Sequence, residues 1–140
     1  MRVLFDTNIV LDFLLERELF LPEALALFTA HDEKKIDAFV SAITPVNIFY
    51  IIRKEAGLQK AVEAVTAILD TLGVCFFDKK ILQDAAQLPV TDYEDAVQIA
   101  AAIAANLDVI VTRDLKDYKN SPLLVYSPSD FLALLAATNQ

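Results

Sequence analysis

The chain has 140 residues, of which 56% are hydrophobic and 23% are charged, and its formal net charge is −8. This length and composition are typical of one compact domain with a large core, so we expect residues 1–140 to form a single domain. Only two glycines, one cysteine and one histidine are present. These counts exclude a Walker A loop, a GxGxxG nucleotide motif, an internal disulfide, a Cys/His zinc cluster and a two-histidine acid–base pair.

Short apolar runs alternate with helical patterns along the whole chain. In chain order the sequence predicts a strand at 2–5, helices at 9–15 and 22–30, a strand at 38–43, helices at 44–54 and 58–72, a strand at 74–77, helices at 79–87 and 92–105, strands at 109–111 and 123–125, and a helix at 131–137. Each strand is a continuous apolar run, which is typical of a parallel sheet covered on both faces. We therefore expect a three-layer α/β/α sandwich with a central parallel sheet of about five strands.

Polar residues at the helix starts predict N-caps. Thr7 or Asn8 is expected to cap the first helix, and Thr44 the helix that follows the second strand. The segment 91–94 matches the S/T-x-x-E capping box, which makes Thr91 the expected cap of the alanine-rich helix.

The apolar segments do not predict a membrane protein. Asp6 and Asp12 interrupt the apolar start, so we expect no signal peptide, and the apolar stretch 96–105 is too short to cross a bilayer. We expect a soluble, cytoplasmic protein in which Cys75 is buried and His31 lies at a helix end without a catalytic role.

Acidic residues follow the predicted strands, where ligands bind in open parallel sheets. Asp6 ends the first strand, and Asp114 follows the fourth. Asp92 and Asp95 lie three residues apart on one face of a helix start. Carboxylates that converge without cationic partners repel one another unless a hard cation is bound, so this pattern favours an oxygen-ligated Mg²⁺ or Mn²⁺ site.

Each acid also has a structural explanation. Asp92 and Glu94 suit a helix start through capping and the macrodipole, and for Glu94 we prefer this interpretation. Asp6 could simply cap the first helix, and Asp114 and Asp117 could be loop residues in a polar turn. The net charge opposes a plain nucleic-acid-binding module, but less so a metal-dependent nuclease, because bound cations neutralise carboxylates locally.

Three segments together resemble the PIN domain family, which includes the VapC-like toxins of toxin–antitoxin pairs. They are residues 6–8 (DTN), residues 92–96 (DYEDA) and residues 111–118 (VTRDLKDY), and the resemblance runs nearly end to end. It implies a parallel α/β/α fold and a Mg²⁺- or Mn²⁺-dependent endoribonuclease that cuts single-stranded RNA. It also implies a homodimer and an antitoxin partner.

Residues are carried over from this resemblance position by position. Asp6, Asp95 and Asp114 match the acidic catalytic and metal-site positions, and Asn8 and Thr112 match polar supporting positions.

One position departs from the family pattern. The family usually carries a glutamate where this chain has Asn47, and a neutral amide oxygen should hold a second metal more weakly. Asp12 or Asp92 could compensate, and Asp117 is a further supporting candidate. The alternative is a catalytically weakened or inactive domain that binds RNA or protein.

Two basic residues flank the site. Arg113 and Lys116 could contact RNA phosphates, or they could form a solvated cationic loop that offsets the acids. A phosphate-handling domain of the receiver or haloacid-dehalogenase type ranks last, because residues 6–8 supply neither an acidic pair nor Asp-x-Asp.

Overall fold

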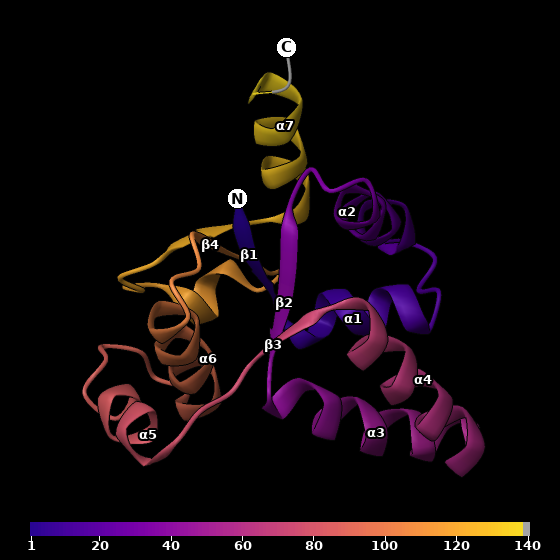
Figure 1. Cartoon of the computed structure of the whole chain (residues 1–140), viewed down its shortest axis with the longest axis horizontal. Helices are drawn as coiled ribbons and strands as arrows, with labels where there is room; N and C mark the ends of the chain where they lie inside the picture. Colours follow the sequence, from indigo (N-terminus) through magenta and orange to yellow (C-terminus); the bar gives the residue numbers. More distant parts are fainter. Residues whose placement is uncertain (139–140) are drawn as a thin grey trace.

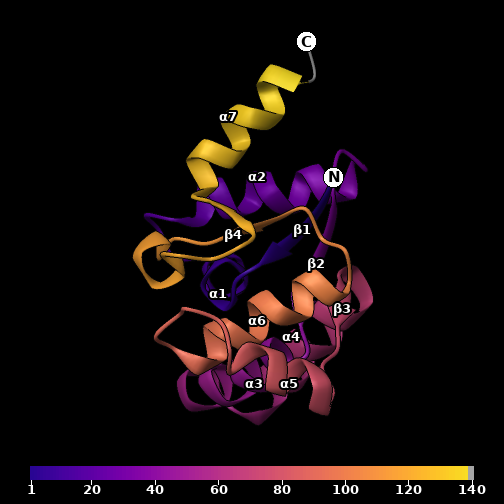
Figure 2. The same cartoon turned by 90° about the vertical axis from the view of Figure 1, so that its left-hand side faces the viewer.

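The computed structural model describes residues 1–138 and contains a five-stranded sheet with helices on both faces (Figures 1 and 2). The strands are β1 Arg2–Phe5, β2 Asp37–Ser41, β3 Gly73–Cys75, β4 Val109–Val111 and β5 Leu124–Tyr126. They run in the order β3-β2-β1-β4-β5, and every neighbouring pair is parallel. The predicted three-layer parallel sandwich is therefore confirmed.

Seven α-helices and one short 3-10 helix fill the outer layers of the described chain. They are α1 Thr7–Leu14, α2 Leu21–Asp32, α3 Ile43–Ala56, α4 Leu58–Thr71, α5 Lys79–Ala85, α6 Tyr93–Ala104, η1 Leu115–Tyr118 and α7 Pro128–Thr138. Figure 1 shows α5 and α6 on one side of the sheet, and α1, α3 and α4 on the other.

Alternation along the central strand separates two cores. Val3 and Phe5 pack with α1, α2, α3, α4 and α7, whereas Leu4 packs with α5 and α6. All three side chains are fully buried, and burial of each contributes about 1.5–3 kcal/mol. Because β1 is covered on both faces after its exposed first residue, Arg2, the next three positions must be apolar, which is why they appear in the sequence as an unbroken apolar run.

The strand order places a topological switch beside β1. The chain builds β1, β2 and β3 outward in one direction and then returns to add β4 and β5 on the other side of β1. Ligand sites of open parallel sheets lie at such a switch, beyond the carboxyl ends of the strands. The backbone N–H of Asp6 donates to the carbonyl oxygen of Val111 at 3.0 Å, so the ends of β1 and β4 are directly joined there.

The predicted N-caps were wrong at three helices. Asp6, and not Thr7 or Asn8, caps α1, because its carboxylate accepts the Thr7 N–H at 2.7 Å. Helix α3 begins at Ile43, and the Thr44 hydroxyl is buried against that of Thr7 at 2.9 Å.

At the third helix, α6, the cap lies one residue later than predicted. Asp92, and not Thr91, accepts the Asp95 N–H at 3.1 Å. The carboxylate reaches a backbone N–H of the first turn, as a threonine hydroxyl can, and also sets a full negative charge against the helix dipole. This shift places Asp95 in the third position of the helix.

Two residues outside the site lie as the sequence predicts. His31 is in the last turn of α2, where Nδ1 accepts the Ala38 N–H at 3.1 Å and Nε2 lies 2.7 Å from the Thr71 carbonyl oxygen. Cys75 is buried, and burial raises its thiol pKa to about 11. Within residues 1–138, no helix is long and apolar enough to cross a membrane.

Candidate active site

Asp6 lies at the centre of the switch region and is only 7% exposed. One carboxylate oxygen accepts from the Thr7 backbone and, at 3.2 Å, from Gln98 Nε2. The other accepts from the Thr112 hydroxyl at 2.8 Å and from Asn8 Nδ2 at 3.4 Å. Each of these donors is neutral, so helix α1, helix α6 and the end of β4 fix the carboxylate without placing a positive charge beside it.

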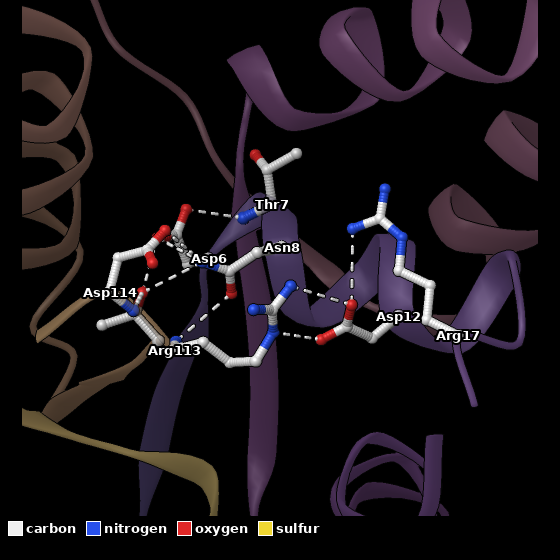
Figure 3. Close-up of polar contacts among 8 residues, drawn as sticks. Asp6, Thr7, Asn8, Asp12, Arg17, Arg113 and Asp114 are labelled. Atoms are coloured by element: carbon white, nitrogen blue, oxygen red, sulfur yellow. Dashed lines mark hydrogen bonds and ion pairs between the residues drawn. The ribbon is translucent and has the colours of Figure 1, made fainter. Parts of the chain in front are cut away.

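Asn8 joins Asp6 to the loop that follows β4. Its Nδ2 donates to Asp114 Oδ2 at 3.1 Å and lies 3.3 Å from the Thr112 hydroxyl, while its Oδ1 accepts the Arg113 N–H at 3.4 Å. The Asp114 N–H in turn donates to the Thr112 hydroxyl at 3.0 Å. Figure 3 shows Asp6 and Asp114 on the same side of Asn8. Asn8 and Thr112 therefore orient both acids, at the positions predicted for supporting residues.

Asp95 brings a third carboxylate toward Asp6 from the first turn of α6. Burial, followed by the carboxylates of Asp6 and Asp92, raises the pKa of Asp95 to about 7, although a hydrogen bond from Tyr118 lowers it. The Asp117 carboxylate, in η1, has a smaller raising effect. When Asp95 is ionised, the neighbouring carboxylates repel it, and a bound cation would relieve that repulsion.

Two further residues contact these acids and were not predicted as site residues. Gln98, one turn after Asp95, is 1% exposed, and its Nε2 donates to Asp6 and to the Tyr118 hydroxyl, both at 3.2 Å. Among the described residues, Gln98 Oε1 has no hydrogen-bond partner. Burial, followed by the carboxylates of Asp6 and Asp95, raises the pKa of Tyr118. The available signal was Gln98 itself, a polar residue three positions after Asp95 in an alanine-rich helix.

Asp12 is placed differently from the expectation that it compensates for Asn47. It is 1% exposed, and its carboxylate is bound by Arg113 through Nε at 2.6 Å and Nη2 at 3.1 Å, and by Arg17 at 3.4 Å. The Arg113 guanidinium also stacks over Phe20, 3.7 Å from the ring centroid. Figure 3 shows the Arg113 side chain extending toward Asp12 and away from Asp6. A buried carboxylate requires such a partner, so in this structure the Arg113 guanidinium is paired with Asp12.

Asn47 contacts an acid that we had assigned to helix capping. Its Nδ2 donates to Glu94 Oε1 at 2.9 Å. Burial raises the pKa of Glu94, and the neighbouring Asp92 raises it further, while the Asn47 hydrogen bond lowers it. A carboxylate is therefore present beside position 47, although another element supplies it.

The remaining predicted residues lie at the rim. Lys116 and Asp117 are exposed in η1, and within residues 1–138 neither forms an ion pair. Asp92 is exposed and caps α6, one turn before Asp95.

The chemistry of the donor set suits a hard cation. Asp6 and Asp114 share the Asn8 amide donor, and Mg²⁺ or Mn²⁺ is commonly bound by one or two carboxylates together with water. In the described part of the chain, no group of three or more histidine, cysteine, aspartate or glutamate side chains is close enough to hold a metal ion unaided. The residues therefore fit a cation held by Asp6 with one neighbouring acid and water.

Fold and site together define an α/β domain with an acidic site at the switch point of a parallel sheet. The model of the PIN domain family matches residues 2–116, and the chain belongs to this family. PIN domains as a family are nucleases that generally use divalent metal ions. A comparison with curated protein sequences gives no match.

Several solved structures have the same fold. VapBC2 of Rickettsia felis, bound to a promoter DNA fragment, is 20% identical with a TM-score of 0.69, over 91% of this chain and 98% of that chain. A toxin–antitoxin complex of Klebsiella pneumoniae is 23% identical with a TM-score of 0.67, over 90% and 97%. VapC20 of Mycobacterium tuberculosis, a Sarcin–Ricin loop cleaving toxin, is 11% identical with a TM-score of 0.62, over 77% and 86%.

Proposed function

We propose that this PIN domain is a Mg²⁺- or Mn²⁺-dependent endoribonuclease that hydrolyses phosphodiester bonds of single-stranded RNA. The observation that carries the proposal is the pair of carboxylates at the switch point, Asp6 and Asp114, which Asn8 and Thr112 hold together, with Asp95 close to Asp6. Among residues 1–138, none of these three acids forms an ion pair. An acidic site without cations, in a family of nucleases, favours metal-assisted phosphodiester hydrolysis.

Asp6 would hold the cation directly, with Asp95 and Asp114 as the neighbouring acids and water completing the coordination. When bound, the ion supplies a lowered pKa for its water, orientation of the phosphodiester and stabilisation of the leaving oxygen. Asn8 and Thr112 keep the carboxylates of Asp6 and Asp114 oriented, as their hydrogen bonds indicate.

Two buried side chains, Gln98 and Tyr118, lie next to Asp6 on the α6 side of the site. Gln98 donates to Asp6 and to the Tyr118 hydroxyl, and both residues are almost fully buried. We propose that they position Asp6 and exclude bulk water from that side.

We further propose that the chain is the toxin of a toxin–antitoxin pair, acting in the cytoplasm as a homodimer. Support comes from its family and from the fold it shares with the VapBC complexes. A neutralising antitoxin protein would then be the partner.

The test combines cleavage with metal binding. Wild-type protein is incubated with a mixed single-stranded RNA pool in Mn²⁺, in Mg²⁺ and in EDTA, alongside Asp6→Asn and Asp114→Asn, and Mn²⁺ binding is measured by calorimetry. Cleavage that requires metal and is lost in both variants is the expected result. Metal binding without any cleavage would contradict the nuclease proposal.

A second candidate is a weakened domain that binds RNA or protein, and the observation that favours it is Asn47. Its neutral amide donates to Glu94 where the family pattern predicts a carboxylate. The Asn47→Glu variant distinguishes the two functions. RNA cleavage by this variant and not by the wild type would identify a disabled nuclease, and no cleavage by either protein would favour the binding module.

A further inference from the structure

The outer face of α3 carries a line of exposed side chains. Val46 and Tyr50 are 50% and 62% exposed, and Arg53 and Lys54 are exposed as well. Helical spacing places Val46, Tyr50 and Arg53 within about 60° of one another around the helix axis, with Lys54 beside them. The opposite side of the helix is buried in the core through Ile48. Helix α3 therefore presents an aromatic ring and two cations together to solvent.

We propose that this face of α3 binds single-stranded RNA that extends from the acidic site, with a base stacked on Tyr50 and phosphate held by Arg53 and Lys54. The proposal rests on the proposed nuclease function and assigns the path of its substrate. Because every base can stack on an aromatic ring, we expect this contact to be independent of RNA sequence.

The exposed line begins beside the acidic site. Asn47, near the start of α3, donates to Glu94 at 2.9 Å, and Glu94 directly precedes Asp95. This contact holds the start of α3 against the start of α6. Tyr50 lies about one helical turn beyond Asn47, and Arg53 lies about 9 Å beyond it along the axis. Figure 1 shows α3 running from the end of β2 away from α6, so a strand bound at the acids can continue along α3.

The Tyr50 ring is suited to stacking. It lies nearly perpendicular to the Phe49 ring, with 5.2 Å between the centroids and 86° between the ring planes. Phe49 itself packs against the core, so this contact restricts the orientation of a ring that is otherwise exposed. Exposed aromatic rings of this kind are the surfaces on which unpaired RNA bases stack.

The charge of Arg53 and Lys54 favours a polyanion as the occupant of this face. The chain has a net charge of −8, yet within residues 1–138 neither of these side chains forms an ion pair. Glu55 follows them, but helical spacing places it about half a turn away from Arg53. Cations in a last turn also complement the helix dipole, which does not account for an exposed Tyr50 one turn earlier. An exposed ring next to unpaired cations is typical of surfaces that bind single strands.

The first experiment measures RNA binding without cleavage. A fluorescein-labelled single-stranded RNA of mixed sequence is titrated in EDTA at several salt concentrations, and anisotropy gives the Kd. We expect Tyr50→Ala to weaken binding about tenfold or more, and Tyr50→Phe, which keeps the ring, to restore it. The double variant Arg53→Gln with Lys54→Gln should lower the slope of log Kd against log salt by about 1.4, because each phosphate contact contributes about 0.7. Tyr50→Ala should leave that slope unchanged.

Lys34→Gln is the matched control for charge. It also removes an exposed cation, but from the turn before β2, whereas α3 follows the other end of that strand. Its RNA affinity and salt slope should equal those of the wild type. Wild-type affinity in Tyr50→Ala, or the same loss of slope per charge in Lys34→Gln as in the α3 variant, would overturn the proposal.

NMR of the ¹⁵N-labelled protein locates the bound RNA. We expect the RNA to shift the amides of 46–54 and of 92–95. Shifts confined to other parts of the chain would overturn the proposal. Shifts of 46–54 that follow protein concentration in the absence of RNA, and that Tyr50→Ala removes, would assign this face to a second copy of the chain and would also overturn it.

Cleavage of the same RNA in Mn²⁺ separates this proposal from the nuclease function. Tyr50→Ala and the double variant of Arg53 and Lys54 should each raise KM more than they lower kcat, because their contacts hold RNA away from the reacting bond. RNA binding along α3 without cleavage would defeat the nuclease function alone. Cleavage with a wild-type KM in both variants would defeat the RNA path alone.

Discussion

The ion pair between Asp12 and Arg113 predicts that Arg113 stabilises the folded protein and does not contact RNA. Arg113→Met removes the bidentate partner of a carboxylate that is 1% exposed and leaves it only the single 3.4 Å contact with Arg17. Breaking a buried pair on one side costs about 3–5 kcal/mol. Because Arg113 itself keeps some solvent contact, we expect the lower end, about 3 kcal/mol, or roughly 6–12 °C in melting temperature.

The assay is urea unfolding together with RNA binding at a temperature where each protein is folded. Arg17→Met is the matched control, and it should cost about 0.2–1 kcal/mol because its contact with Asp12 is single and more exposed. The double variant Asp12→Leu with Arg113→Met should regain most of the lost stability, since no unpaired buried charge remains. An Arg113→Met protein with unchanged stability but weaker RNA binding would refute this reasoning and restore Arg113 as a phosphate contact.

Three further predictions follow from the site and the core. Asp95→Asn should raise the melting temperature in EDTA, because it removes a like charge from the Asp6 and Asp92 carboxylates, and should diminish the stabilisation gained on adding Mn²⁺; a lower melting temperature in EDTA would contradict this. Asn47→Glu should destabilise the metal-free protein by about 1–2 kcal/mol, because a second carboxylate replaces the donor to Glu94, and should increase the thermal shift produced by Mn²⁺; equal shifts in the two proteins would argue against a metal near position 47. Cys75 should react with iodoacetamide at pH 8 about a hundredfold more slowly in the native than in the unfolded protein, since folding raises the thiol pKa from 9.0 to about 11. The stability that the buried neutral thiol contributes should be lost as the pH rises from about 9 through 11, and Cys75→Ser is the control.

The sheet and its acidic edge could be predicted from the sequence because both depend on local composition. A strand buried on both faces must be an apolar run, and the residue that follows it is the first that can be polar, as at Asp6 after β1 and at Thr112, two residues before Asp114, after β4. The parallel arrangement then brings those residues to one edge. This reasoning required no knowledge of which helix lies beside which strand.

The pairings between side chains could not be predicted in the same way. Asp12 and Arg113 are 101 positions apart, and Asn47 and Glu94 are 47 apart, so each contact depends on how separate elements pack. The cap of α6 was missed for a different reason. Thr91 and Asp92 are both good N-caps, and local propensity does not decide between neighbours that differ by one position.

The position of the Arg113 side chain explains why the acids of the site have no positively charged partner. Arg113 lies between Thr112 and Asp114 in the sequence, and its side chain could have neutralised Asp114. Instead, its backbone N–H contacts Asn8, while its guanidinium binds Asp12 and stacks on Phe20. The buried Asp12 thus binds the Arg113 guanidinium and anchors the loop after β4. The carboxylates of Asp6, Asp95 and Asp114 are left to neutral donors, which is the condition under which a divalent cation would bind most strongly there.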